Sequence, residues 1–86
     1  MLKIKADVPL TNLINIGFES KQSMKGTLIY CKSYGNYNVM IRDKDRQVFI
    51  YNPTEKSLSY NLPLSCIYIR DLVQKGYIEN DKDVKN

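Results

Sequence analysis

The sequence predicts an α+β domain in which an antiparallel meander sheet of three or four strands lies between two short helices, in the order α-β-β-β-β-α. Apolar residues follow helical spacing only near the two ends of the 86-residue chain, and short β-rich segments separated by turn residues occupy the middle. Because a domain of this size has one thin core, we expect both helices to pack on one face of the sheet. We expect residues 1–80 to form this single domain and residues 81–86 to be a frayed, charged tail.

The N-terminal part predicts a short edge strand over residues 3–7 and then the first helix. After Pro9, four apolar residues fall at positions i, i+3, i+4 and i+8, which places them on one helical face. They are Leu10, Leu13, Ile14 and Phe18. Gly17 ends this pattern, and we expect it in the left-handed conformation with Phe18 folding back onto the helix. The polar residues 19–23 predict a loop.

The middle of the chain predicts the strands of the sheet. The β-rich segments are residues 25–33, 37–42, 47–51 and 58–62. Residues 34–36 and 43–46 are short turns, so the strands that they join must be antiparallel. Residues 48–51 are consecutive apolar residues, and the pattern leaves open which of them point inward.

The second helix is predicted after Pro63, which blocks strand pairing and suits the first turn of a helix, with Ser65 as an alternative N-cap. Its apolar face consists of Cys66, Ile69, Leu72 and Val73. Gly76 ends the helix, and we expect the apolar residues 77–78 to follow as the chain turns back.

Composition limits the location and the partners of the chain. The net charge of +4 and the pI near 9.1 leave nucleic acid or an acidic protein surface open as partners. No apolar run approaches the ~18 residues that a membrane span needs, so we expect no membrane partner and a cytoplasmic location. Cys31 and Cys66 are too far apart for a CxxC pair or a zinc half-site, and we expect both to be reduced core residues.

The side chains of most active sites are missing from the sequence. It contains no histidine, the commonest general base and metal ligand. Most carboxylates fall in predicted turns or in the tail, and the four glycines are isolated, without the spacing of a phosphate-binding loop. We therefore expect a protein that is not an enzyme, with no cofactor and no metal site.

One segment combines cations with aromatic residues and has no acidic residue between Ser20 and Ile41. Its members are Lys21, Lys25, Lys32, Tyr30, Tyr34 and Tyr37. Single-stranded nucleic acids are bound by such a combination, because cations follow the phosphates and aromatic rings stack on the bases. The structural interpretation is that tyrosines suit strands and lysines protect strand edges.

Residues 71–79, from Asp71-Leu72-Val73 to Gly76-Tyr77-Ile78-Glu79, resemble the end of the recognition helix in winged-helix DNA-binding proteins. That fold needs a β-hairpin wing after the helix. Only residues 80–86 remain here, and the predicted hairpins precede the helix, so this resemblance stays a minor alternative.

A second resemblance covers about a third of the positions. It includes Met1-Leu2-Lys3-Ile4-Lys5, the segment from Leu10 to Glu19 with Asn15-Ile16-Gly17-Phe18, and the segment from Ile69 to Glu79. Together with the short β-rich middle, these segments resemble small proteins of phages and mobile elements of low-GC Gram-positive bacteria. The resemblance carries no catalytic motif, so it implies a setting and not an activity.

These observations favour a protein-binding module, in that setting a phage-encoded modulator or inhibitor of a host or defence protein. The residues expected to anchor the partner are Tyr34, Tyr37, Arg42 and Arg46, on two adjacent hairpin turns. The alternative is a nucleic-acid-binding protein that uses the lysine and tyrosine set. A homodimer is left open, through the edge of the strand at residues 25–33 or of that at residues 58–62.

Overall fold

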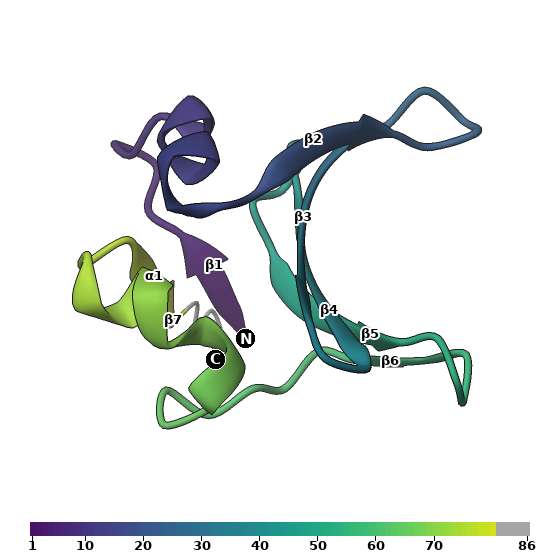
Figure 1. Ribbon diagram of the computed structural model, residues 1–86. Helices are drawn as coiled ribbons and strands as arrows, with labels where there is room; N and C mark the ends of the chain where they lie inside the picture. Colours follow the sequence, from purple (N-terminus) through teal and green to yellow (C-terminus); the bar gives the residue numbers. More distant parts are fainter. Residues whose placement is uncertain (81–86) are drawn as a thin grey trace, which may run out of the picture.

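The structure is a computed structural model that describes residues 1–80, and it consists of a five-stranded sheet, a two-stranded sheet and two short helical segments (Figure 1). The strands are β1 (Leu2–Ile4), β2 (Glu19–Gln22), β3 (Leu28–Tyr34), β4 (Tyr37–Arg42), β5 (Val48–Asn52), β6 (Ser57–Ser59) and β7 (Ile78–Asn80). The helices are η1 (Leu10–Ile16), η2 (Ile67–Ile69) and α1 (Arg70–Gln74), and η2 runs directly into α1. The predicted α+β class is confirmed. The predicted tail at residues 81–86 lies outside the described residues.

The large sheet is an antiparallel meander with the order β2-β3-β4-β5-β6. It has five strands where three or four were predicted, because residues 19–22, expected to be a loop, form β2. All four side chains of β2 are exposed, so no alternation of apolar and polar residues marked it as a strand. Hairpin hydrogen bonds hold it on β3: the Ser23 amide donates to the Thr27 carbonyl (2.8 Å), and the Thr27 amide donates to the Ser23 hydroxyl (3.0 Å).

The expectation that the strand at residues 25–33 is a sheet edge is therefore wrong. β2 pairs with β3 from Glu19 opposite Cys31 to Gln22 opposite Leu28, so β3 lies inside the sheet. The edges are β2 and β6.

The two ends of the described chain meet in the small sheet. β1 and β7 pair antiparallel, with Leu2 opposite Asn80 and Ile4 opposite Ile78. The apolar return that was predicted after Gly76 is thus a strand. The Ile4 amide also donates to the Arg46 carbonyl (2.9 Å), which ties the small sheet to the turn between β4 and β5.

The first helical segment is a 3-10 helix throughout and the second begins as one, and this changes which side chains they bury. In a 3-10 helix, residues three apart lie on one line. In η1, Leu10 and Leu13 are buried and Ile14 is 47% exposed. In the second segment, Ile69 and Leu72 are buried and Val73 is 36% exposed. The prediction that Ile14 and Val73 belong to the apolar faces is wrong, because it assumed α-helical spacing from the first residue.

Both helix ends are as predicted. Gly17 has φ +100° and Gly76 has φ +73°, in the left-handed region that favours glycine. The Phe18 amide donates to the Leu13 carbonyl (3.1 Å), and the Tyr77 amide donates to the Leu72 carbonyl (3.0 Å). The chain therefore reverses after each helix and returns an aromatic residue toward it.

The core lies between one face of the five-stranded sheet and the remaining elements. We call this side the core face; it carries Tyr30, Lys32, Tyr34, Tyr37, Val39, Ile41, Val48 and Ile50, which alternate along β3, β4 and β5 and are aligned by the strand register. Its central side chains pack with Ile4 of β1, Leu13 of η1 and Leu72 of α1. Figure 1 shows the helices, β1 and β7 together on this one side of the sheet.

Within residues 1–80, no helix has the length and apolar character that crossing a membrane would require.

Candidate binding surface

The four predicted anchor residues do not share one surface. Tyr34 and Tyr37 lie on the core face, where their rings contact Tyr68, with centroid distances of 6.0 and 5.1 Å. Arg46 donates from Nη1 to the carbonyls of Lys5 (2.7 Å) and Val8 (2.6 Å), so it holds the N-terminal segment in place. The fourth, Arg42, lies on the opposite face of the sheet.

The predicted nucleic-acid set is also divided by the fold. Tyr30 is buried and lies on the core face with Tyr34 and Tyr37, whereas Lys21 points to the other face and Lys25 lies at the tip of the β2–β3 hairpin. Lys32 is engaged in an ion pair on the core face. The structure thus does not bring the six residues onto one surface.

Lys32 is the centre of a polar contact that joins three segments. Its Nζ donates to the carbonyl of Ile16 (2.7 Å) and to Oδ2 of Asp71 (2.7 Å), and the Tyr34 hydroxyl donates to the same carboxylate oxygen (3.0 Å). Nζ also lies 5.0 Å from the centroid of the Tyr34 ring and 5.8 Å from that of Phe18, within the range of cation–π attraction. The contact ties β3 to the end of η1 and to α1, so we assign it a structural role.

The ionisation of this pair follows from these contacts. Burial of the Lys32 ammonium disfavours its charge, but the hydrogen bonds with Asp71 and Tyr34 outweigh this effect and raise the pKa of Lys32. The hydrogen bonds from Lys32 and Tyr34 lower the pKa of Asp71. Both groups are therefore charged at neutral pH.

The other face of the five-stranded sheet carries a second set of apolar side chains. We call it the open face; it carries Ile29, Cys31, Met40, Arg42, Phe49, Tyr51 and Leu58, which alternate with those of the core face and are aligned across β3 to β6. The register also places the polar residues Glu19, Lys21, Ser33 and Asn38 on this face. In Figure 1, no helix or strand among residues 1–80 lies over this side of the sheet. The Tyr60 ring packs onto it, with its centroid 5.4 Å from that of Phe49.

Arg42 is held rigidly on the open face. Its guanidinium carbon lies 5.1 Å from the centroid of the Phe49 ring and 5.9 Å from that of Tyr60. Nε and Nη2 donate to the two carboxylate oxygens of Asp45 (3.3 and 3.1 Å), and Nη2 also donates to Gln47. A fixed arginine between aromatic rings is an arrangement that protein interfaces use as an anchor.

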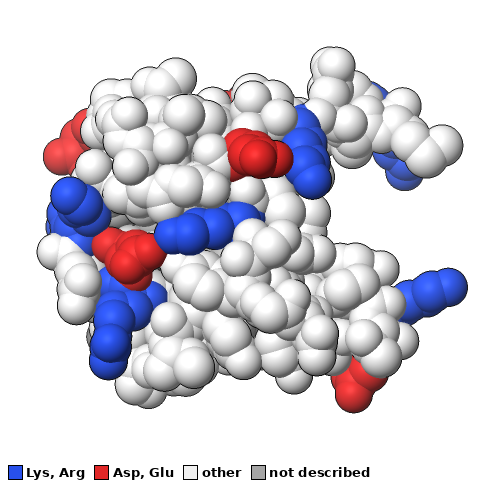
Figure 2. Space-filling model, in the orientation of Figure 1, with Lys and Arg blue, Asp and Glu red and all other residues white. Residues whose placement is uncertain are grey.

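The molecule is hollowed on the side of the open face. Figure 2 shows the surface hollowed at the right, between the projecting β2–β3 hairpin and the end of the β5–β6 hairpin. Cys31 and Phe49 are buried at 8% and 5% exposure without belonging to the main core cluster. Burial raises the pKa of the Cys31 thiol, an effect that Glu19 supports and Lys21 opposes, so the thiol is protonated at neutral pH.

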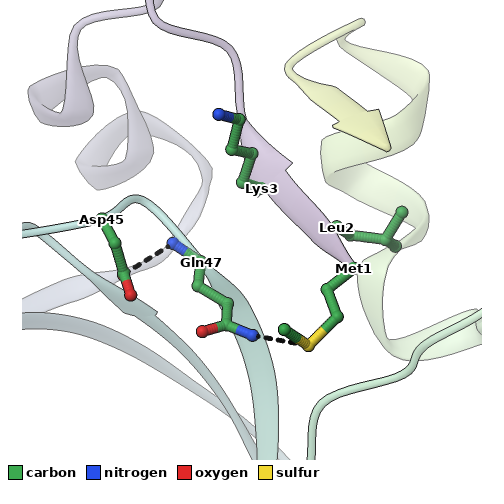
Figure 3. Close-up of a pocket in the computed structure, with 5 residues that line it drawn as sticks. All are labelled: Met1, Leu2, Lys3, Asp45 and Gln47. Carbon is green, nitrogen blue, oxygen red and sulfur yellow. Dashed lines mark hydrogen bonds between the residues drawn. The ribbon is translucent and has the colours of Figure 1, made fainter. Parts of the chain in front are cut away.

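A pocket of about 190 Å³ lies beside the N-terminus and is lined by Met1, Leu2, Lys3, Asp45 and Gln47 (Figure 3). Gln47 donates from its backbone amide to Asp45 (3.1 Å) and from Nε2 to the sulfur of Met1 (3.0 Å). Asp45 is also paired with Arg42, and Figure 3 shows the amine of Lys3 directed away from Gln47. The side chains of Asp45 and Gln47 in this pocket are thus already engaged in hydrogen bonds and an ion pair. Across residues 1–80, no three His, Cys, Asp or Glu side chains are grouped as metal ligands would be.

The sequence reasoning missed most of the open face. The signal was the run Val48-Phe49-Ile50-Tyr51, because a strand that is apolar at every position has a reason to bury both faces. Two of these residues belong to the core face and two to the open face. What the sequence could not show is which strands lie beside them.

Comparison of the chain with protein-family models, with curated proteins and with solved structures finds no match.

Proposed function

We propose that this chain is a non-enzymatic protein-binding module that holds its partner on the open face. The observation that carries the proposal is the two-sided sheet: one face packs on the helices and the small sheet, and the other presents apolar and aromatic side chains with a fixed arginine. Leu58 is 47% exposed on this face, and Ile29, Met40 and Tyr51 are half-buried. Apolar side chains that remain accessible in one area mark interaction sites in small proteins.

The composition of the open face favours a protein partner. Interface centres are enriched in aromatic residues, methionine and arginine and depleted in lysine, and Met40, Arg42 and Tyr51 fit that description. Lys21 lies on the same face but on the edge strand β2. A nucleic-acid surface needs cations gathered along a backbone track. Figure 2 shows Lys and Arg spread over the view and not collected in one patch.

The biological setting is proposed from the resemblance to small phage and mobile-element proteins. A protein of that kind acts in the cytoplasm of the host, and its partner is a host or defence protein that it modulates or inhibits. Binding by shape and apolar contact needs no catalytic group, in agreement with the lack of histidine in the sequence.

The test is affinity capture of the tagged protein from bacterial lysate, with and without nuclease, using wild type, Tyr51→Ala and Ile14→Ala. Tyr51 lies on the open face, and Ile14 is an exposed apolar residue of η1. Truncation of a central anchor costs about 2 kcal/mol, or roughly 30-fold in affinity. We expect one stoichiometric protein that survives nuclease, is lost with Tyr51→Ala and is kept with Ile14→Ala.

Two results would contradict the proposal. Recovery of nucleic acid, with all proteins lost on digestion, would favour the alternative in which aromatic rings and cations bind a single strand. Equal capture by both variants would show that the partner binds elsewhere.

A further inference from the structure

Three exposed apolar side chains meet at one depression on the side of η2 and α1. Leu64 is 53% exposed, Ile67 is 67% exposed and Val73 is 36% exposed, and all three line a depression of about 290 Å³ together with Arg70 and Gln74. We call this set the helix patch. It is formed by the loop before η2 and by the two helices, so it is distinct from the open face.

The order of side chains along the helix patch is apolar, cationic, apolar. Ile67, Arg70 and Val73 are spaced by three along η2 and α1, which places them on one side of this short helical segment. The buried residues Ile69 and Leu72 lie on a different side of the same segment. The segment therefore presents one stripe to the core and a second apolar stripe, interrupted by one cation, to the outside.

Arg70 has no ion pair with any other residue in the range 1–80. The neighbouring carboxylate of Asp71 accepts hydrogen bonds from Lys32 and Tyr34, and the charge of Arg70 acts on it only as a small further effect that lowers its pKa. A partner that covers the helix patch must therefore supply an anion for Arg70, because a buried guanidinium without a partner is costly.

We infer that the helix patch binds an amphipathic helix of a partner protein that carries an acidic residue between two apolar residues on its contact face. A helix satisfies its own backbone hydrogen bonds, whereas an extended segment needs a free strand edge, which the patch does not offer. Apolar residues at i and i+7 with a carboxylate at i+3 or i+4 match the order Ile67, Arg70, Val73.

Two other occupants fit the helix patch less well. A second copy related by a two-fold axis would bring the central Arg70 of each copy close to the other, and like charges oppose each other there. Residues 81–86 supply one large apolar side chain, Val84, against the three that the patch exposes.

The test is an NMR titration of the ¹⁵N-labelled full chain with an 18-residue amphipathic helical peptide that has glutamates between its leucines, and with the same peptide with lysines instead. We expect the acidic peptide to shift resonances of residues 64–74 and to bind at least tenfold more tightly than the basic one. Ile67→Ser should abolish the shifts, and Arg70→Glu should reverse the preference for charge. Ile14→Ser, a matched exposed apolar residue on η1, should leave binding unchanged.

Several outcomes would overturn the inference. They are equal affinity for the two peptides, no binding at millimolar peptide, shifts confined to β4 and β5, self-association that Ile67→Ser abolishes, and peptide binding that appears only after residues 81–86 are removed. Because the open face is tested separately, Tyr51→Ala should retain peptide binding, and a failure of either proposal leaves the other standing.

Discussion

The two faces of the five-stranded sheet differ in what covers them, although their residues alternate along the same strands. On β4, Val39 and Ile41 are fully buried under the helices, while Met40 and Arg42 between them are half-buried on the open face. The sheet needs only one face to join the two helices and the small sheet into a core. The second face carries apolar side chains around Arg42 with no helix or strand of residues 1–80 over them in Figure 1, and this difference is the basis of the proposed function.

The largest expected effect is a difference in the stability lost at two neighbouring residues of β4. Ile41→Ala should lower the free energy of unfolding by about 2–5 kcal/mol, because it leaves a cavity in the covered core. Met40→Ala should cost less, about 1 kcal/mol, because Met40 is only half-buried. Urea unfolding followed by circular dichroism measures both, and Ile41→Val serves as a milder variant if Ile41→Ala does not fold. Equal losses at the two positions would mean that the open face is also part of the core.

A smaller difference in stability is expected between alanine substitutions at two glycines. Gly17→Ala should cost about 2 kcal/mol or more, because the left-handed conformation is strained for alanine and the new Cβ would lie 3.1 Å from Cε of Lys32. Gly35→Ala in the β3–β4 turn should cost only about 1 kcal/mol, since φ is +56° there and no atom lies within 4 Å of the new Cβ. Thermal unfolding of the two variants checks this order, and a larger loss at Gly35 would contradict it.

The Lys32–Asp71 contact predicts a dependence of stability on pH. The pKa of Asp71 is lowered in the folded state, so its contribution is present above the usual aspartate pKa near 4 and is lost as the pH falls through the lowered value. We expect less than about 1 kcal/mol, because the Asp71 side chain is 44% exposed. Asp71→Asn should flatten the acid limb of the stability profile relative to wild type. If the acid limb of the stability profile were the same in Asp71→Asn and in wild type, the Lys32–Asp71 contact would make no contribution to stability.

The smallest effect concerns the cysteines. Cys31 is buried with a raised pKa, and Cys66 is half-buried and lies beside the helix patch. A thiol reagent at neutral pH should therefore modify Cys66 before Cys31, because the thiolate is the reacting species. Mass spectrometry of single-cysteine variants, Cys31→Ala and Cys66→Ala, measures the two rates. Faster reaction at Cys31 would contradict its burial on the open face.

The features of the fold that depend on local chemistry were predictable from the sequence. Gly17 and Gly76 end their helices as expected, and the strands from residue 28 to residue 52 follow the predicted hairpins. β2 was missed because a strand with four exposed side chains has no apolar pattern, and its pairing with β3 is set by the hairpin.

The candidate site was less predictable because it depends on which strand faces are covered. Tyr34 and Tyr37 are close to a turn in sequence, but they lie on the core face against Tyr68. Arg42 was named as an anchor, whereas its aromatic neighbours Phe49 and Tyr60 come from later segments. Sequence distance cannot show such neighbours.

The most direct test of the central claim uses the three methionines as reporters. Met40 lies on the open face, Met24 is fully exposed at the hairpin tip, and Met1 is 53% exposed beside the N-terminal pocket. The protein is labelled at the methionine methyl groups with ¹³C and titrated with nuclease-treated lysate from the host. The account predicts that the Met40 signal shifts or broadens while those of Met24 and Met1 do not. A shift at Met1 or Met24 with Met40 unchanged would place the partner elsewhere and contradict the account.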